Sequence, residues 1–117
     1  TADHQRGAVG AVLRFDGIVR REEQGLRVGE PTRAIEGLVY QTYEPMTERM
    51  LRELAIETVS RHALLGLTVL HSRGLVPVGK TSFVLLVRSR HRAEGFHAMT
   101  TFVDRMKQSV PIWKRPV

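Results

Sequence analysis

Residues 81–110 read TSFVLLVRSRHRAEGFHAMTTFVDRMKQSV, and this stretch decides the class of fold. Its first part, 81–88, is rich in apolar and β-branched residues, which is typical of a buried strand. The part from 91 to 110 carries apolar residues at helical spacing, and Pro111 would end that helix because proline cannot continue the hydrogen-bond ladder. One strand followed directly by one helix is therefore the unit around which the other segments must pack.

Turn signals divide the rest of the chain into shorter segments. Glu44-Pro45 punctuates the sequence, and Pro45 suits the first turn of a helix because its missing N–H needs no partner there. The segments that we expect are strands over 7–20, 34–43 and 67–71, a helix from 46 to Gly66, a mobile charged loop over 21–33 and a Gly/Pro-bearing connection over 74–79. We therefore predict a single domain over 1–117 of the α+β class, with antiparallel strands and two main helices.

The composition narrows the function. The 117 residues carry 18 Lys+Arg against 12 Asp+Glu, a formal net charge of +6, and the cations are 15 Arg and only three Lys (Lys80, Lys107 and Lys114). No cysteine is present, which excludes a disulfide scaffold, a cysteine-ligated metal and a thiol nucleophile. The positive charge indicates an anionic partner. A nucleic-acid-binding domain is one alternative, although aromatic residues are only 6% and no nucleic-acid-binding motif occurs.

Several familiar sites are missing from the sequence. The five histidines show no metal-ligand spacing such as HExxH, and neither a Walker A sequence nor GxSxG or GxGxxG occurs. We therefore expect no metal and no resident cofactor. The longest apolar runs are far below the ~20 residues of a membrane span, so we expect no membrane partner.

A helical-wheel projection of 91–110 places one lysine in an apolar stripe. With Phe96 at zero, Val103 falls at about −20° and Lys107 at about +20°. Two interpretations stay open for this lysine. It could extend its ammonium group to water at the C-terminal end of the helix, where the helix dipole favours a cation. It could instead line a cleft and take part in proton transfer or nucleophilic chemistry.

A dense basic cluster precedes that helix. Residues 88–92 read RSRHR, and Ser89 is a candidate N-cap. Arg92 beside the helix N-terminus would make an anion site, because the free amides there carry partial positive charge. A solvated surface cluster is the alternative interpretation. Trp113, beyond the helix, either docks the end of the chain onto the core or walls a pocket.

Four groups of residues, spread in order over nearly the whole chain, resemble one family. They are Phe15-x-Gly-x-Val-Arg20, Tyr43-Glu-Pro-Met46, Ser89-x-His-Arg92, and Lys107 with Pro111-x-Trp-Lys114. Together they are similar to the large, MoaE-type subunit of molybdopterin synthase. The resemblance implies an α/β-hammerhead-type fold and a cytoplasmic homodimer.

The same resemblance implies an activity and its partners. Each protomer would bind a small ubiquitin-like (MoaD-type) sulfur-carrier subunit, which gives a heterotetramer. The carrier's C-terminal Gly-Gly thiocarboxylate would supply sulfur. The acceptor would be cyclic pyranopterin monophosphate, which becomes the molybdopterin dithiolene. The implied activity is that of a sulfurtransferase without a nucleic-acid or membrane partner.

The matched motifs also imply the site residues. Lys107 and Lys114 match the two active-site lysines of the family, so we expect them to receive the thiocarboxylate tail and to assist proton transfer. Arg20, His91 and Arg92 match its substrate-binding residues, and we expect them to hold the phosphate and the pterin.

One position departs from the family pattern. The family often has His-Arg-x-Gly after its third strand, whereas this chain reads His71-Ser72-Arg73-Gly74. A shift by one place on a strand reverses the side on which a side chain lies, so Arg73 is given no role. Besides the nucleic-acid-binding domain, a non-catalytic scaffold for a ubiquitin-like partner stays open as an alternative function.

Overall fold

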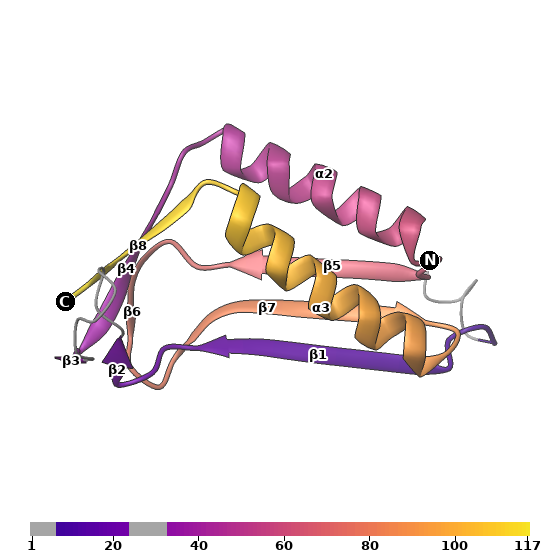
Figure 1. The fold of residues 1–117 in the computed structure, drawn as a ribbon, viewed down its shortest axis with the longest axis horizontal. Coiled ribbons are helices and arrows are strands. Elements are labelled where there is room, and N and C mark those ends of the chain that lie inside the picture. The colour runs from indigo at the N-terminus through magenta and orange to yellow at the C-terminus, as the bar shows by residue number, and fades with distance from the viewer. Residues whose placement is uncertain (1–6, 24–32) are drawn as a thin grey trace.

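The computed structural model describes residues 7–23 and 33–117, and Figure 1 shows how their elements are arranged. The elements are β1 (Ala11–Ile18), β2 (Glu22–Glu23), β3 (Arg33–Ala34), β4 (Gly37–Thr42), α2 (Met46–Arg61), β5 (Gly66–His71), β6 (Gly74–Pro77), β7 (Thr81–Ser89), α3 (Arg92–Ser109) and β8 (Ile112–Pro116). The predicted α+β class with antiparallel strands and two main helices is confirmed. Most of the loop expected over 21–33 lies outside the described residues.

The larger sheet has the strand order β1-β7-β5, with both pairs antiparallel. The two helices cover the same face of this sheet (Figure 1). The central strand β7 supplies Leu85 and Val87 to the interface, and α3 supplies Phe102; all three are fully buried. Burying one such side chain contributes about 1.5–3 kcal/mol, so this layer holds α3 firmly on the sheet.

The smaller sheet, β6-β4-β8, stands at one end of the larger one (Figure 1). It packs on a separate small core that comprises Val19, Ile35, Leu38 and Val76. Two backbone hydrogen bonds attach the residues after β1 to this end: the Val19 N–H donates to the Lys80 carbonyl at 3.0 Å, and the Gly79 N–H donates to the Val19 carbonyl at 2.8 Å. The chain is therefore anchored immediately before Arg20.

The helix α2 ends before Gly66, so that predicted end is wrong. Ala63 adopts a left-handed backbone with φ 52°, and the Leu64 N–H donates to the Val59 carbonyl at 3.0 Å. This is a Schellman ending in which alanine stands where glycine is common. Gly66 instead begins the strand β5.

The strand predicted over 34–43 is not continuous, because the backbone changes partners within it. The Ile35 N–H donates to the Arg21 carbonyl at 2.8 Å, whereas the Glu36 N–H donates to the Val117 carbonyl at 2.7 Å. The first hydrogen bond continues the β2–β3 pair, and the second connects the chain to the end of the smaller sheet. The strand expected over 7–20 is also shorter than predicted, since β1 covers Ala11–Ile18.

Two segments that were not predicted as strands pair with β4. The first is β6, which lies in the connection expected over 74–79 and forms an edge strand. Gly74, the first residue of β6, has φ 77°. Pro77 is tolerated at the other end because proline has no N–H to donate, and an edge strand needs no donor on its outer side. The second is β8, which follows Pro111, the residue that ends α3 as predicted.

The apolar stripe of the helical wheel does not coincide with the most buried face of α3. The buried residues are Gly95, Ala98, Phe102 and Met106, whereas Phe96 is 60% exposed and lies about 120° around the helix from Phe102. Gly95 explains the difference, because a Cβ there would lie 2.7 Å from a methyl group of Leu13. The helix thus approaches the sheet most closely along its smallest residues, which a wheel weighted by hydrophobicity does not favour.

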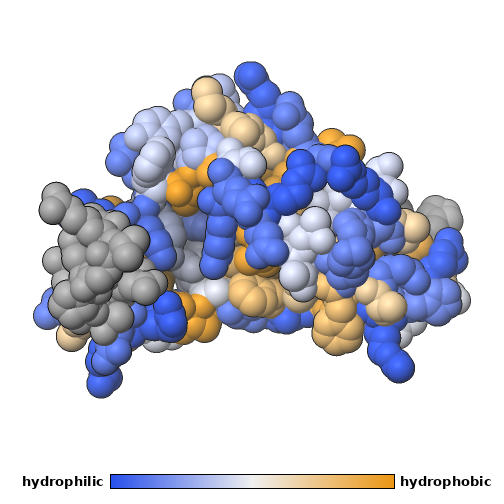
Figure 2. Space-filling model, viewed as in Figure 1, coloured by the Kyte–Doolittle hydropathy of each residue, from blue (hydrophilic) through white to orange (hydrophobic). Residues whose placement is uncertain are grey.

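The helical side of the molecule is mainly hydrophilic, with smaller hydrophobic areas between the polar side chains (Figure 2). Neither helix in the described ranges is long and apolar enough to cross a membrane.

The packing of α3 gives a matched pair of substitutions. Phe102→Ala empties a fully buried position and should lower the free energy of unfolding by about 3–5 kcal/mol. Phe96→Ala on the same helix should change it by about 0.5 kcal/mol. Denaturant titration of the two variants measures both values. A larger loss for Phe96→Ala than for Phe102→Ala would contradict the observed face.

Candidate functional site

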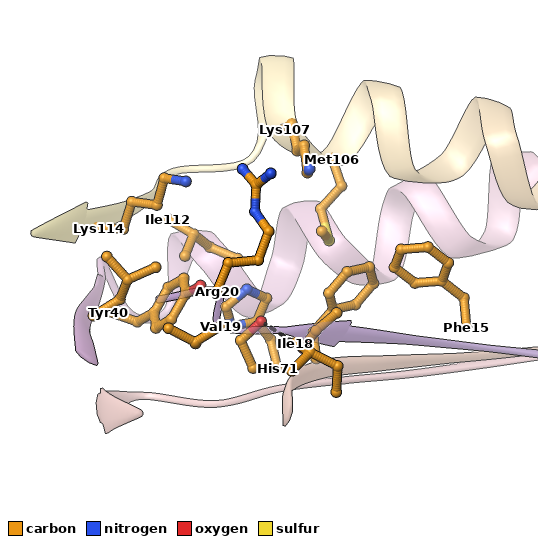
Figure 3. A pocket seen from close by; sticks show the side chains of 14 residues that line it. Phe15, Ile18, Val19, Arg20, Tyr40, His71, Met106, Lys107, Ile112 and Lys114 are labelled. Atoms are coloured by element: carbon orange, nitrogen blue, oxygen red, sulfur yellow. Dashed lines mark hydrogen bonds between the residues drawn. The ribbon is translucent and has the colours of Figure 1, made fainter. Parts of the chain in front are cut away.

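A cavity of about 330 Å³, here called the pocket, opens where the end of β1, the smaller sheet and the C-terminal end of α3 meet. Three of the five predicted site residues, Arg20, Lys107 and Lys114, line it. Figure 3 shows the guanidinium group of Arg20 between the amino groups of the two lysines, all turned toward the same space. The structure therefore brings together three cations that are up to 94 positions apart in the sequence.

Arg20 reaches the pocket because of the way in which β1 ends. The pairing register shifts between Gly17 and Ile18, and Gly17 leaves room for the ring of Phe83, which would lie 2.7 Å from an added Cβ. Val19 then turns into the small core. Successive side chains of an extended segment point to opposite sides, so Arg20 points into the pocket.

The two lysines come from consecutive elements. Lys107 lies in the last turn of α3, where a cation complements the negative end of the helix dipole. The strand β8 then runs back antiparallel to β4 and places Lys114 opposite Tyr40, and both residues line the pocket. Lys107 is thus both a cation at the C-terminal end of α3 and a residue that lines a cleft.

A buried hydroxyl group fixes the turn between α3 and β8. Thr47, at the start of α2, is only 2% exposed. Its Oγ1 donates to the Pro111 carbonyl at 2.8 Å and accepts the Tyr43 N–H at 2.8 Å. Since Pro111 lies between Lys107 and Lys114, this bond helps to set the position of one lysine relative to the other.

The pocket is strongly positive. No Asp or Glu is among the described residues that line it. Arg20 and Lys107 form no ion pair with any carboxylate in the part of the chain that the structure describes. Like charges that converge in a partly enclosed space repel each other, and an anionic ligand would offset this repulsion. The geometry is therefore that of an anion-binding site.

Four rings form a continuous aromatic wall of the pocket. Their order is Phe15, Phe83, His71 and Tyr40, with centroid separations of 5.4, 5.8 and 5.1 Å along the row. His71 stacks on Phe83 at an interplanar angle of 13° and meets Tyr40 at 71°. A flat ring system with an anionic group would find both an aromatic surface and cations here.

Sequence reasoning missed His71 and Tyr40 as pocket residues. The segment that contains His71 was noticed only for the displaced Arg73. That arginine points elsewhere and pairs with Glu44 at 3.1 Å. Burial lowers the pKa of His71, while the hydrogen bond between its Nδ1 and the Ser72 carbonyl, at 2.8 Å, acts in the opposite direction.

His91 and Arg92 do not line the pocket. His91 occupies the N-cap position of α3 and Arg92 is its first residue, so 15 residues, or about 22 Å of helix, separate Arg92 from Lys107. Figure 1 shows the two ends of α3 at different ends of the larger sheet. Both residues are exposed, and the ring of His91 lies 3.0 Å from the Glu94 carboxylate. A single copy of the chain does not bring them to the three cations.

Two further expectations near this helix need correction. Ser89 is not the N-cap; it is fully buried as the last residue of β7, and its hydroxyl donates to the His91 carbonyl at 2.6 Å. Trp113 neither walls the pocket nor docks onto the core, because its side chain is 63% exposed. It precedes Lys114 on β8 and therefore points to the other side of the smaller sheet.

Comparison with known proteins identifies the family of the chain. A family model described as "MoaE protein" matches residues 1–109. The chain belongs to the MoaE family. Among curated relatives, the molybdopterin synthase catalytic subunit of Thermoplasma volcanium is 34% identical over 113 residues, which are 97% of this chain and 77% of the relative.

Other MoaE relatives are considerably longer than this chain. The molybdopterin synthase catalytic subunit of Oryza sativa is 37% identical over 116 residues, 98% of this chain but 56% of the relative. The human protein of the same name is 32% identical over 108 residues, 92% of this chain and 54% of the relative. The chain thus spans just over half the length of these two relatives.

Solved structures share the fold. Molybdopterin synthase from Staphylococcus aureus superposes with a TM-score of 0.80 at 26% identity and covers 100% of this chain and 84% of that one. A complex of subunits 1 and 2 of molybdopterin-converting factor from Helicobacter pylori gives a TM-score of 0.75 at 24% identity, over 97% of this chain and 70% of that one. The second likeness, at this identity, concerns the fold alone.

The half-buried His71 of the pocket predicts a dependence of stability on pH. Its pKa is lowered in the folded state, so the unfolded chain binds the proton more readily as the pH falls below the usual histidine value of about 6.5. The free energy of unfolding should therefore fall between about pH 7 and pH 5.5, above the range in which carboxylates titrate. Burial and the charges of His97 and Arg61 lower the pKa of His62 as well, which adds to the same slope.

Denaturant titrations at several pH values measure this slope. The variant His71→Phe keeps a ring in the aromatic wall but removes its titration, and its stability should fall less steeply with decreasing pH than that of the wild type. Equal slopes would show that His71 does not contribute.

Proposed function

We propose that this chain is the catalytic subunit of a molybdopterin synthase. In this role it is a cytoplasmic sulfurtransferase that moves sulfur from the thiocarboxylated C-terminus of a small ubiquitin-like subunit to cyclic pyranopterin monophosphate. The observation that carries the proposal is the convergence of Arg20, Lys107 and Lys114 on one pocket beside an aromatic wall. Membership of the MoaE family, whose relatives are named as catalytic subunits of this enzyme, supports it.

Both proposed ligands are anions, which suits the charge of the pocket. A thiocarboxylate and a phosphate repel each other, so their approach requires cations between or around them. Arg20 offers a planar fork of N–H donors that matches a phosphate group. Lys107 and Lys114 offer compact charges for the thiocarboxylate end of the carrier. Holding both reactants in one cavity converts an encounter between them into an oriented attack.

The lysines can also manage a proton. When the sulfur bonds to a substrate carbon, the displaced oxygen needs a proton, and an ammonium group beside it can donate one. Arginine retains its proton at any ordinary pH and cannot do this readily. The chain has 15 arginines and only three lysines. Two of those lysines, Lys107 and Lys114, line the pocket, while Lys80 lies in the turn before β7.

A second copy of the chain would account for the remaining predicted residues. His91 and Arg92 lie at the far end of α3 from the pocket of their own chain. We propose that in the homodimer they approach the pocket of the other protomer and bind the phosphate or pterin there. With one small subunit on each protomer the assembly is a heterotetramer.

The alternative functions gain no support from the site. Three convergent cations recessed in a cavity differ from the extended basic surface with exposed aromatic residues that a single-stranded nucleic acid requires. A scaffold without activity would have no need of lysine in place of arginine at two pocket positions.

The proposal predicts a large effect at Lys107. With a thiocarboxylated carrier and cyclic pyranopterin monophosphate, Lys107→Ala should lower the rate of dithiolene formation by about 100-fold or more, and Lys107→Arg should also be strongly impaired. Lys80→Ala, at the lysine outside the pocket, is the matched control and should keep the wild-type rate. Near-normal turnover by Lys107→Arg would contradict a role in proton transfer.

The contribution of a second copy is tested by mixing two inactive variants. In a dimer of one Lys107→Ala chain and one Arg92→Ala chain, the pocket with the intact lysine would receive the intact arginine of its neighbour. Statistical exchange of subunits should then restore about a quarter of the wild-type activity. If Arg92 acts only within its own chain, the mixture should remain as inactive as the separate variants.

A further inference from the structure

One side chain of the pocket can accept a proton at neutral pH. The ionisable groups of the described lining are the cations Arg20, Lys107 and Lys114, the phenol of Tyr40 and the imidazole of His71. The cations and the phenol O–H are donors, and no carboxylate is among the lining residues that the structure describes. His71 is therefore the basic group of the pocket.

The ring of His71 is held in one tautomer. Its Nδ1 lies 2.8 Å from the carbonyl oxygen of Ser72. A carbonyl oxygen can only accept, so Nδ1 carries the hydrogen and Nε2 carries the free lone pair. Stacking on Phe83 and the edge contact with Tyr40 hold the plane of the ring.

The Nε2 atom of His71 is not buried among the described residues. Nε2 has no hydrogen-bond partner among the described residues. Every buried side-chain nitrogen and oxygen atom of those residues does have a partner. Nε2 is therefore not sealed inside the protein, and the ring to which it belongs lines the cavity. A base with this geometry needs a proton to accept.

Sulfur transfer supplies such a proton. After the carrier's sulfur has bonded to a substrate carbon, the carrier remains attached through an acyl carbon–sulfur bond. Release of the carrier requires a nucleophile at that acyl carbon, and water is the simplest one. Attack by neutral water is slow unless a base removes a proton as the new bond forms.

We propose that Nε2 of His71 takes the proton from the water that releases the carrier, an assignment that rests on the proposed function. The water oxygen bonds to the acyl carbon, the acyl carbon–sulfur bond breaks, and its electron pair stays on sulfur. The products are the carrier's carboxylic acid, a thiolate on the pterin side and protonated His71. The carboxylic acid then loses its own proton to solvent, and the nearby ammonium groups stabilise the thiolate.

The surroundings of His71 determine its pH response. The charged groups that line the same pocket are Arg20 after β1, Lys107 on α3 and Lys114 on β8, with the Tyr40 phenol on β4. Burial is the main cause that lowers the pKa of His71, and the hydrogen bond with the Ser72 carbonyl acts in the opposite direction. His71 is thus neutral at pH 7, and its protonation at lower pH should stop the release step.

The test separates formation of the acyl–sulfur adduct from its hydrolysis. Single-turnover reactions with the thiocarboxylated carrier and cyclic pyranopterin monophosphate are followed by mass spectrometry from acidic to neutral pH. The variant His71→Asn keeps an N–H for the Ser72 carbonyl but removes the base, and His71→Gln removes it in a second way in case the first variant folds poorly. His97→Asn, an exposed histidine on α3, is the matched control.

In the wild type, hydrolysis should accelerate with pH along one ionisation and then level off. Both His71 variants should still form the adduct and accumulate it, because they hydrolyse it about 100-fold more slowly, and they should lose that acidic limb. The control should match the wild type.

Unchanged hydrolysis in the variants would overturn the assignment while the proposed function stands. So would slow hydrolysis with the wild-type pH profile, which indicates a structural role. No product from the wild type would overturn the proposed function and this assignment with it.

Discussion

The turn that joins α3 to β8 is the constraint on which the pocket depends. Pro111 ends the helix, and the buried hydroxyl of Thr47 binds the Pro111 carbonyl at 2.8 Å. The chain then returns along β4 in a fixed register. Without this anchor, Lys107 on the helix and Lys114 on the strand would belong to two independently placed elements. With it, two cations seven positions apart in the sequence face one cavity.

The pocket combines two surfaces of different chemistry. The cations come from the ends of β1 and α3 and from β8, whereas the aromatic wall comes from the strands of both sheets. The firmly packed layer of Phe102 on Leu85 and Val87 holds the helix, and the small core around Val19 holds the end of β1. Two separate cores thus support the elements on either side of the site. They hold the cationic donors in place, as the binding of anionic reactants requires.

The sequence predicted the fold class and both helices, but not every boundary, and the family resemblance named three residues that line the pocket and two that do not. Turn chemistry located Pro111 correctly, whereas Gly66 misled because Ala63 took the left-handed position that glycine usually fills. The face of α3 depended on how closely the sheet could approach Gly95, which periodicity does not contain. His71 was missed as a pocket residue because its place beside the cations depends on the pairing of β5 with β7, which the local sequence does not reveal. The separation of Arg92 from the pocket follows from the length of α3, which places Arg92 and Lys107 at opposite ends of the helix.

The central claim is that sulfur passes from a carrier protein to the pterin in this pocket. The most direct measurement uses a carrier whose thiocarboxylate holds the heavy isotope ³⁴S, the wild-type chain and cyclic pyranopterin monophosphate, followed by mass spectrometry of the product. The account predicts a dithiolene in which both sulfur atoms are the heavy isotope, together with a carrier that ends in an ordinary carboxylate. A product without the label, or an unchanged carrier and pterin, would contradict it.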